Sequence, residues 1–532
     1  MFVLDSSSSV SLIQQIVDGF SRMIEEGSLR SGSKLPSIRQ FAHTHGVSVY
    51  TVVDAYDRLV AQGYFVSRPH LGFFVRRRRQ DDGEVSNAGM RYDFDSLYYM
   101  RRIFEHRGLS RKPGCGWLPE DWLFGDGVRR ALRTLASGEI SISGYGEPKG
   151  FAPLRQLIRD LLTEHEVALT SEQILLTQGS SHALDLIARR LVHAGAPVLI
   201  DDPSYANLCF GLRLLGCELL GVTRTPEGYD LALLERLLET HRPKVFFTQP
   251  RLHCPTGVSA TLAHMYRVLQ LAEKYDVTLV ENDIYSDLDP RPYPSFASLD
   301  QLNRVVYISS FSKTISPNLR VGYMAGNPEL IEDMAQLKMI AGLTSAELSE
   351  RIVYGALIDG RWRKHAKTLR DRLTAAHEKV AARFLALGFE LFTEPKAGMF
   401  LWVRHPRIAD ANALALRATE HDILLGPGHL FSPGLEPSPW LRFNVAFCED
   451  EAVFDYLRLE LDNVRDAVDG DGPDPAGSQV PRAGRNTKTV PCAGRPTTEP
   501  TGSGAHEAPD PASPLGHGSC DANEQQGVRK PL

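Results

Sequence analysis

The chain has 532 residues, of which 42% are hydrophobic and 23% charged, and its formal net charge is −6. This length exceeds one ordinary domain, and the composition is that of a globular protein, so we expect two or three folded units. No apolar run approaches the roughly 20 residues of a membrane-spanning helix. The N-terminus MFVLDSSSSV has no basic region followed by an apolar one, as a secretory signal would. We therefore expect a cytoplasmic protein without membrane association.

The seven cysteines are scattered, and none forms a CxxC motif or a cysteine–histidine cluster with metal-ligand spacing. This distribution favours a reducing compartment and predicts no structural metal. Charge is uneven, because ten Lys and Arg stand against six Asp and Glu up to Gln80 in a chain that is acidic overall. A locally basic unit suggests a polyanionic partner, although a solvated basic surface would give the same count.

Residues 11–75 follow the order helix, helix, helix, hairpin. Apolar residues recur at helical spacing in the first segment. Ser37 can cap the second helix, and Gln40 three residues later completes a capping box. A THG turn comes next, and Ser48 can cap the third helix. The stretch GYFVSRPHLGFFV then alternates around a Pro/Gly turn, which predicts a two-stranded wing.

The rest of the chain divides by composition. The run RRRRQDDGEVSNAGM lacks apolar periodicity and predicts a linker over 76–109, after an N-terminal domain over 1–75. Over 110–468, apolar runs such as QILLT and VTLVEND alternate with helical patterns, which predicts an α/β sheet buried on both faces and then a small α+β lobe. Residues 469–532 are rich in Pro, Gly and Ser, so we expect a disordered tail.

The stretch SKLPSIRQFAHTHGVSVYTVVDAYDRLVAQGYFVSRPHLGFFV resembles the winged helix-turn-helix of GntR-type regulators. The resemblance implies binding to double-stranded DNA, with the N-terminal end of the third helix in the major groove. Ser48, Tyr50 and Thr51 are then the candidate DNA contacts. Arg39, near the start of the preceding helix, is a candidate phosphate clamp. Each of the four could instead be an ordinary exposed helix residue.

The stretch YISSFSKTISPNLRVGYM places Lys313 after an apolar run, with Ser310 and Ser312 before it and Arg320 seven residues later. Burial and a cationic neighbour lower the pKa of a lysine and make it a useful nucleophile. The planar fork of an arginine suits a phosphate. Together these side chains predict a site for an aldehyde cofactor that carries a phosphate.

With its other motifs, this part of the chain resembles fold-type I enzymes of the aminotransferase class, which use pyridoxal 5'-phosphate (PLP). Joined to a GntR-like winged helix, the whole chain resembles the MocR group of transcriptional regulators. The resemblance implies an α/β PLP-transferase domain with a small C-terminal α+β lobe. It also implies PLP as cofactor, a homodimer, and an amine or amino acid as effector.

The same resemblance implies roles for single residues. Lys313 matches the lysine that forms the Schiff base with PLP, while Ser310 and Arg320, with Ser312 beside them, match phosphate ligands. The loop TQGSSHALDL matches the one that opens a helix and cups the phosphate. The other matching positions are Ser180 and Ser181 in that loop, Tyr205 stacked on the ring, Tyr145 reaching the site of the partner subunit, and Arg442 on a substrate carboxylate.

Two motifs depart from the family pattern. Relatives usually carry Asn-Pro-Thr-Gly, whereas HCPTG places Cys254 in the Asn position. A thiol is a poor hydrogen-bond partner, so the contact to the phenolic oxygen of the cofactor is weakened or comes from His253 or another group. Tyr285 is a further candidate for that oxygen.

The second departure concerns the aspartate that pairs with the pyridine nitrogen, often spaced Asp-x-x-Tyr. In ENDIYSDL, Asn282 has that spacing and Asp283 follows it. Neighbouring strand residues point to opposite faces, so we expect only one of the two to reach the ring. Either Asn282 leaves the nitrogen without a counter-anion, or Asp283 serves as the acid, for which the sequence gives a slight preference.

These patterns predict a DNA-binding regulator that senses PLP, or an amine or amino acid that reacts with it, through aldimine formation on Lys313. Two alternatives stay open. The chain could be a working aminotransferase with a DNA-binding module, or a regulator whose large domain has lost the cofactor and serves as a dimerisation scaffold.

Overall fold

The computed structural model describes residues 109–138, 144–394 and 397–469, together with most of residues 4–75. Within 4–75 the gaps are at 6–7, 9, 26–27, 30–31, 63 and 69–71. The predicted linker up to residue 108, and the predicted tail after residue 469, lie outside the described residues. None of the described helices is long and apolar enough to cross a membrane.

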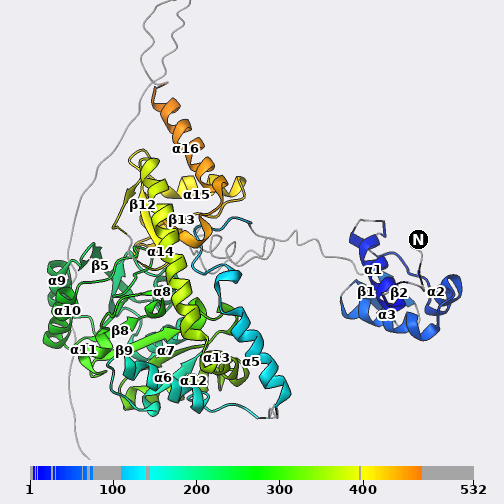
Figure 1. The fold of residues 1–532 in the computed structure, drawn as a ribbon, viewed down its shortest axis with the longest axis horizontal. Helices are drawn as coiled ribbons and strands as arrows, with labels where there is room; N and C mark the ends of the chain where they lie inside the picture. The colour runs from blue at the N-terminus through cyan, green and yellow to red at the C-terminus, as the bar shows by residue number, and fades with distance from the viewer. Residues whose placement is uncertain are drawn as a thin grey trace, which may run out of the picture. The chain divides into compact units, whose positions relative to one another are not determined.

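The N-terminal unit consists of three helices and an antiparallel hairpin in the predicted order (Figure 1). Its elements are α1 (Leu12–Glu25), α2 (Ile38–His45), α3 (Val49–Ala61), β1 (Phe65–Arg68) and β2 (Gly72–Val75). The rings of Phe20, Tyr56 and Phe65 meet edge to face at the centre. Packing of these aromatic rings joins the helices to the hairpin.

Both predicted caps of this unit form. Ser37 Oγ accepts a hydrogen bond from Gln40 N, and Ser48 Oγ accepts one from Thr51 N. Of the two hydrogen bonds of the predicted capping box, the structure shows the one from Gln40 N to Ser37 Oγ. The Gln40 side chain is exposed. Gly46 ends α2 with a φ of 65°, a left-handed conformation that glycine adopts readily. The turn after it sets α2 and α3 at an angle.

The large unit is built on an eight-stranded sheet between layers of helices (Figure 1). Its strands are β3 (Ile174–Thr177), β4 (Pro197–Asp202), β5 (Glu218–Thr225), β6 (Gly228–Tyr229), β7 (Val245–Thr248), β8 (Thr278–Asn282), β9 (Val305–Ser310) and β10 (Gly322–Ala325). Their order is β3-β10-β9-β8-β7-β4-β5-β6. Strands β9, β8, β7, β4 and β5 run parallel, whereas β10 is antiparallel to both neighbours.

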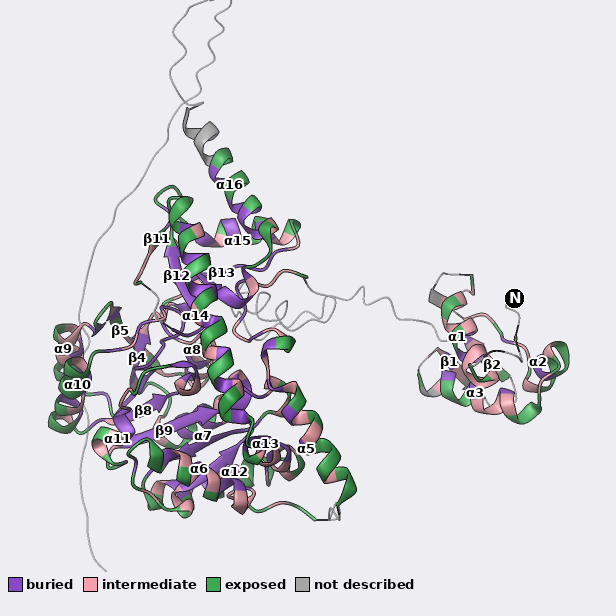
Figure 2. Ribbon diagram, in the orientation of Figure 1, coloured by how far each residue is buried: buried purple, intermediate pink, exposed green. Residues whose placement is uncertain are grey.

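Alternate residues of the central strands face the two helical layers, and both faces are buried (Figure 2). Leu279 of β8 packs in one layer and Val280 in the other. The first layer contains α6 (Ala152–Glu164), α9 (Leu231–His241), α10 (Leu262–Tyr275), α11 (Phe296–Asp300) and α13 (Glu347–Ile358), which packs on α5 (Gly125–Ser137). The second contains α7 (Ser180–Leu191), α8 (Ala206–Leu214) and α12 (Pro328–Gly342). The near-continuous apolar strands thus have the two-sided burial that their sequences predict.

The small lobe is a four-stranded antiparallel sheet with helices, as predicted (Figure 1). Its elements are α14 (Trp362–Ala386), β11 (Glu390–Leu391), β12 (Phe400–Arg404), α15 (Ala411–Glu420), β13 (Gly426–Pro427), β14 (Trp440–Asn444) and α16 (Glu451–Asp469). Helix α14 joins the lobes, because Trp362 packs in the core of the large sheet and Phe384 in that of the small lobe.

Candidate functional site

The side chains with chemical potential gather at the carboxyl ends of the parallel strands. Asn282 is the last residue of β8, Gln249 follows β7, and Lys313 ends a short 3-10 turn, η4 (Phe311–Lys313), after β9. Tyr205 follows β4 at the start of α8. In open α/β sheets this edge is where ligands bind.

An anion cradle forms where α7 begins. Ser180 and Ser181 open α7, and the first N–H groups of a helix have no partner inside it. Gly179 has a φ of 80°, and a Cβ atom there would lie 2.5 Å from Arg320 Nη2, so only glycine lets the guanidinium approach the turn. A Cβ on Gly322 would lie 2.7 Å from the Gly179 backbone. The cradle therefore depends on two glycines, of which Gly179 admits Arg320 and Gly322 admits the Gly179 backbone.

Small hydroxyls complete this cradle. Arg320 donates to Gln178 O at 3.2 Å and to Ser312 Oγ at 3.5 Å. Ser310 Oγ accepts from Ser312 N at 3.2 Å. The structure thus brings together the arginine, the serines and the helix N-terminus, a set that suits a phosphate.

Lys313 lies beside the cradle and donates a hydrogen bond to Gly116 O. Its Nζ is 5.8 Å from the centre of the Tyr285 ring. The pKa of Lys313 is lowered to about 8, mainly by burial and to a lesser extent by the nearby Arg442 and Arg320, while nearby cysteines oppose this. A larger fraction of this amine than of an ordinary lysine is therefore neutral and nucleophilic near neutral pH.

Arg442 lies in the centre of β14 and is buried near Lys313. It donates to Cys254 Sγ at 3.3 Å and to Gly114 O. Its guanidinium lies 4.7 Å from the ring centre of Phe400 and 4.6 Å from that of Phe431. This held cation suits a carboxylate. Cys254, in the position where relatives have Asn, thus contacts Arg442.

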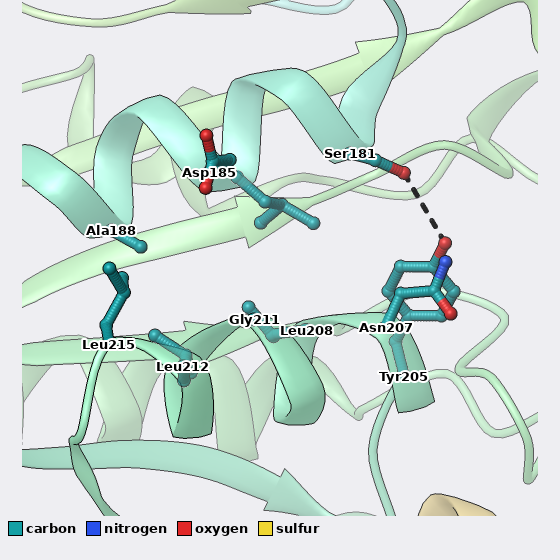
Figure 3. Close-up of a pocket in the computed structure, with 10 residues that line it drawn as sticks. Ser181, Asp185, Ala188, Tyr205, Asn207, Leu208, Gly211, Leu212 and Leu215 are labelled. Atoms are coloured by element: carbon teal, nitrogen blue, oxygen red, sulfur yellow. Dashed lines mark hydrogen bonds between the residues drawn. The ribbon is translucent and has the colours of Figure 1, made fainter. Parts of the chain in front are cut away.

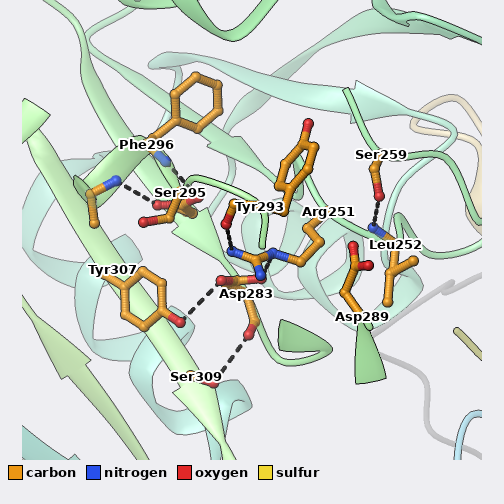
Figure 4. A network of polar contacts seen from close by, with 12 residues as sticks. Arg251, Leu252, Ser259, Asp283, Asp289, Tyr293, Ser295, Phe296, Tyr307 and Ser309 are labelled. Carbon is orange, nitrogen blue, oxygen red and sulfur yellow. Dashed lines mark hydrogen bonds and ion pairs between the residues drawn. The ribbon is translucent and has the colours of Figure 1, made fainter. Parts of the chain in front are cut away.

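Asn282 and Asp283 point to different surroundings. Asp283 forms an ion pair with Arg251 at 3.2 Å and accepts a hydrogen bond from Tyr307 at 3.0 Å (Figure 4). Asn282 is 6% exposed, and its Oδ1 has no hydrogen-bond partner among the residues that the structure describes. Asn282 alternates with Val280, so it faces the layer of α7 and α8, against which Tyr205 also packs.

Gln249, like Asn282, is a buried amide side chain with one atom that has no hydrogen-bond partner among the described residues. Its Oε1 accepts from Cys254 N at 3.1 Å, whereas its buried Nε2 finds no partner within the described ranges. Thr248 of β7 pairs with Glu281 of β8. Gln249 and Asn282 are the next residues of these two parallel strands, so they lie at neighbouring positions at the strand ends. Two buried amides with unused capacity at a strand edge indicate a place for a polar ligand.

Tyr285 and His253, the predicted partners of a phenolic oxygen, lie in different surroundings. Tyr285 is buried, packs edge-on against Phe400 at 5.8 Å between ring centres, and has a pKa raised by burial. His253 instead bonds Thr256 Oγ1 at 2.8 Å and lies 3.5 Å from Asp201. Burial lowers the pKa of His253 to about 4, so the ring is neutral and engaged away from Lys313.

A small pocket opens next to Tyr205 (Figure 3). Tyr205 OH lies 3.5 Å from Ser181 Oγ at its polar end. The rest is lined mainly by aliphatic side chains of α7 and α8 (Leu184, Ala188, Leu208, Leu212, Leu215). The ring of Tyr205 thus stands between the cradle and an apolar groove.

Not every predicted residue joins this constellation. Tyr145 is 83% exposed, and within the part of the chain that the structure describes it does not join Lys313 or the cradle. In the N-terminal unit, Tyr50 is 81% exposed, whereas the hydroxyls of Ser48 and Thr51 bond each other at 2.7 Å. Arg39 is exposed on α2.

Sequence reasoning missed several residues that the site contains, Gln249 among them. The carbonyls of Gly114 and Gly116 meet Arg442 and Lys313, and Arg251 neutralises Asp283. The glycine pair in PGCG was a usable signal, because closely spaced glycines often mark a close backbone approach. Arg251 gave no signal, since its partner is distant in sequence.

Comparison with known proteins agrees with this geometry. Residues 126–457 match the aminotransferase class I and II family, and residues 12–75 match the bacterial regulatory proteins of the gntR family. The first match spans more than half of the chain, so the protein belongs to the aminotransferase class I and II family. It carries a GntR-type helix-turn-helix domain in front, and the predicted MocR-type arrangement is confirmed.

Similar curated proteins are of two kinds. The uncharacterized regulator YdcR of Escherichia coli is 28% identical over 82% of this chain and 95% of that protein. The probable rhizopine catabolism regulatory protein MocR of Rhizobium meliloti is 28% identical over 81% and 88%. The 2-aminoadipate transaminase of Thermus thermophilus is 31% identical over 66% and 90%. The chain is thus similar to regulators along most of its length and to enzymes over its large unit.

Solved structures confirm the predicted fold. The α-aminoadipate aminotransferase LysN of Thermus thermophilus, complexed with N-(5'-phosphopyridoxyl)-L-leucine, has a TM-score of 0.60 and 27% identity over 68% of this chain and 98% of LysN. The multiple substrate aminotransferase of Thermococcus profundus has a TM-score of 0.64 and 23% identity over 72% and 96%. The large unit is therefore a fold-type I aminotransferase domain.

Proposed function

We propose that this protein is a transcriptional regulator of the cytoplasm whose aminotransferase-like domain binds PLP on Lys313 and responds to an amino compound that carries a carboxylate. One observation carries the proposal. A partly buried lysine with a pKa lowered to about 8 lies near an anion cradle and the buried cation Arg442, in a chain that also carries a GntR-type DNA-binding domain.

The residues present fit PLP. The cofactor's phosphate matches the cradle at Gly179 and Arg320, which a Cβ atom on the glycine would fill. The unpartnered Asn282 Oδ1 and Gln249 Nε2 offer polar contacts to a heteroaromatic ring. When bound, PLP supplies an aldehyde that reacts with amines. Lys313 is the amine beside the cradle that could receive it.

The remaining groups would bind and orient. The first N–H groups of α7, with Ser310 and Arg320, would hold the phosphate. Tyr205 would flank the ring, and Tyr285 would approach its phenolic oxygen. Arg442 would hold the carboxylate of an effector through its planar fork. These roles follow from the site's contacts together with the family resemblance.

The decisive experiment is a visible spectrum. Purified protein with PLP should show an absorption band above 400 nm, roughly where imines of PLP absorb, and Lys313→Ala should lose it. Borohydride reduction and peptide mapping should label Lys313. Lys338 is a matched internal control, since burial also lowers its pKa to about 8 but its Nζ donates to Pro148 O, Leu176 O and Ser345 Oγ. A protein that never binds PLP sinks the proposal.

A working aminotransferase is the second candidate. The match to 2-aminoadipate transaminase favours it, as does the presence of Lys313, Tyr285 and Arg442 in one site. Asn282 counts against it, because an amide gives a pyridine nitrogen no counter-anion. Amino-group transfer to keto acids at useful turnover would favour an enzyme. The visible band also removes the third possibility, a scaffold without cofactor.

DNA binding is implied by the GntR-type domain. We propose Tyr50 as the main base contact, because it stands out from the N-terminal turn of α3 while the Ser48 and Thr51 hydroxyls cap the helix. Those two hydroxyls can still reach phosphates or bases through their second lone pairs. Arg39 remains the proposed phosphate clamp.

We also propose a homodimer. Exposed apolar side chains gather near α12 and α13, among them Ile340, which is 84% exposed. The segment that carries Tyr145 lies against this region, because Lys338 of α12 donates to Pro148 O and a Cβ on Gly146 would lie 3.0 Å from Glu347. A second copy covering this surface would bury it and bring Tyr145 towards the partner's site. The other members of the surface are Met339, Leu343 and Leu348.

A further inference from the structure

Residues 110–117, here called the strap, lie between the DNA-binding domain and the body of the large unit in the sequence. The strap follows the predicted linker and precedes Leu118 and Trp122, which are buried in the core of the small lobe. Its centre, Pro113 to Cys115, is also buried. In the sequence, the strap is therefore the part of the large unit that directly follows the predicted linker.

Backbone bonds hold the strap along the small lobe. Gly114 N donates to Leu424 O at 2.8 Å, and Asn444 N donates to Pro113 O at 2.7 Å. Asn444 Nδ2 also donates to Trp117 O at 2.6 Å. A Cβ on Gly114 would lie 2.3 Å from the Leu425 backbone, so the backbone of the strap is in direct contact with the backbone at Leu425.

Side chains fasten the beginning of the strap. Ser110 N donates to Asp422 Oδ1 at 2.9 Å, and Arg111 forms ion pairs with Asp450 at 2.6 Å and with Asp422 at 3.6 Å. These charges are partly exposed, so solvent and salt weaken them. The end nearest the linker is thus the more easily loosened one.

Two carbonyls of the strap meet the two cations of the site. Gly116 O accepts from Lys313 Nζ, and Gly114 O accepts from Arg442 Nη2. Lys313 lies in the turn after β9 of the large sheet and Arg442 in β14 of the small lobe, so the tripeptide 114–116 contacts both lobes at the site. Hydrogen bonds to charged groups are among the stronger ones in proteins.

We propose that the strap is a ligand-released latch that couples the site to DNA binding. Without ligand, Gly114 and Gly116 hold Arg442 and Lys313. Occupation of Lys313 by PLP and of Arg442 by a carboxylate removes this hold, and the loosened strap changes the affinity for DNA. This inference rests on the proposed function.

The chemistry of each ligand supplies the release. If the neutral Lys313 amine condensed with the aldehyde, the aldehyde oxygen would leave as water with both amine hydrogens, and the unprotonated imine nitrogen would have no hydrogen to donate to Gly116 O. A carboxylate on Arg442 places negative oxygens beside the carbonyl oxygen of Gly114, and like partial charges repel at short range. PLP and the effector thus act on neighbouring carbonyls of the same strap.

Hydrogen exchange of the intact protein tests the latch without any ligand. Lys313→Ala removes the donor to Gly116 O, so amides of residues 110–118 should exchange faster by roughly tenfold, which corresponds to one lost hydrogen bond of this kind. Lys274→Ala, at an exposed lysine of α10, is the control and should leave this exchange unchanged. Unchanged exchange in Lys313→Ala overturns the latch, whether or not PLP binds.

Two probes separate the carboxylate from the cofactor. N-(5'-phosphopyridoxyl)-L-alanine and N-(5'-phosphopyridoxyl)ethylamine differ only in the carboxylate. We expect the alanine adduct to raise exchange of residues 110–118 more than the ethylamine adduct. Equal or slower exchange with the alanine adduct overturns the latch alone, whereas failure of both adducts to bind overturns the proposed function.

A loosened strap should also act on DNA without ligand. Asp422→Asn keeps a residue that tolerates the left-handed backbone at position 422, where φ is 61°, but removes the charge that holds Arg111. Its affinity for DNA fragments selected by the full chain should shift in the same direction as that of the PLP-loaded protein. A shift in the opposite direction, or none while strap exchange rises, overturns the coupling.

Discussion

At the scale of single residues, the chemistry of the site turns on which of two neighbours faces the cofactor ring. The sequence left Asn282 and Asp283 open, with a slight preference for Asp283. In the structure both carboxylate oxygens of Asp283 are engaged by Arg251 and Tyr307. Asn282 faces the layer that holds Tyr205 and keeps an unused Oδ1. These contacts favour Asn282, and with it a ring nitrogen without a counter-anion.

This choice predicts a gain of function. Asn282→Asp should raise amino-group transfer from amino acids to keto acids by at least about tenfold, since a carboxylate stabilises a protonated ring nitrogen. Asp283→Asn is the matched control and should give no gain, because its partners lie away from the ring. Single-turnover transfer measured by mass spectrometry of the cofactor checks both variants. Equal rates in Asn282→Asp and the parent protein would argue against Asn282 as the ring contact.

The pKa of Lys313 sets a pH dependence. Burial lowers this pKa to about 8, so the neutral amine gains population as pH rises through 8 rather than through 10.5, the ordinary value for lysine. The rate of PLP attachment, followed by stopped-flow absorbance, should therefore rise between pH 7 and 9 and then level off. A rate that keeps rising towards pH 10 would show that Lys313 is not desolvated in this way.

At the scale of elements, the helix pair α2 and α3 presents one exposed arginine and one exposed aromatic to a partner. Arg39 lies in the first turn of α2, and Tyr50 in the first turn of α3. The Ser48 cap orients α3, and Gly46 sets the turn between the helices. Capping residues and base contacts thus compete for the same few positions.

The two exposed residues predict different losses. Arg39→Ala should weaken binding to every DNA sequence and reduce the slope of log affinity against log salt by about one, because one phosphate contact is lost. Tyr50→Ala should lower discrimination between sequences and leave the salt slope nearly unchanged. Fluorescence anisotropy at several salt concentrations measures both. Arg58→Ala is a control, since Arg58 is bound to Asp54 at 3.1 Å.

At the scale of the whole molecule, the large unit leaves an apolar surface around Ile340 and an exposed Tyr145. Ile340→Glu should place a charge in the proposed subunit interface and raise the dimer dissociation constant by at least about tenfold, since a buried unpaired charge costs more than 1.4 kcal/mol. Light scattering over a range of concentrations measures this. Leu214→Glu, at an exposed leucine that ends α8, is the control. A variant that stays dimeric at nanomolar concentration would place the interface elsewhere.

Much of the fold could be predicted from local patterns. Two-sided apolar strands such as VTLVEND predict a buried parallel sheet, and the caps at Ser37 and Ser48 predict helix starts within a residue. Lys313, Ser310 and Arg320 could be grouped because they lie close together in sequence. Contacts between distant segments, such as Arg442 with Gly114, could not be predicted, because no local pattern records them. The predicted domain boundaries stay predictions.

The sequence by itself determined the two fold classes, and it predicts Lys313 as the reactive lysine. Periodicity, caps and motif spacing are properties of neighbours along the chain, so they survive without a structure. Only the tertiary structure decided that Asp283 is held by Arg251, that His253 is turned to Asp201, and that the strap reaches Lys313 and Arg442. Those outcomes depend on which side chains meet at the strand edge, and folding brings them there from segments that are not neighbours in the sequence.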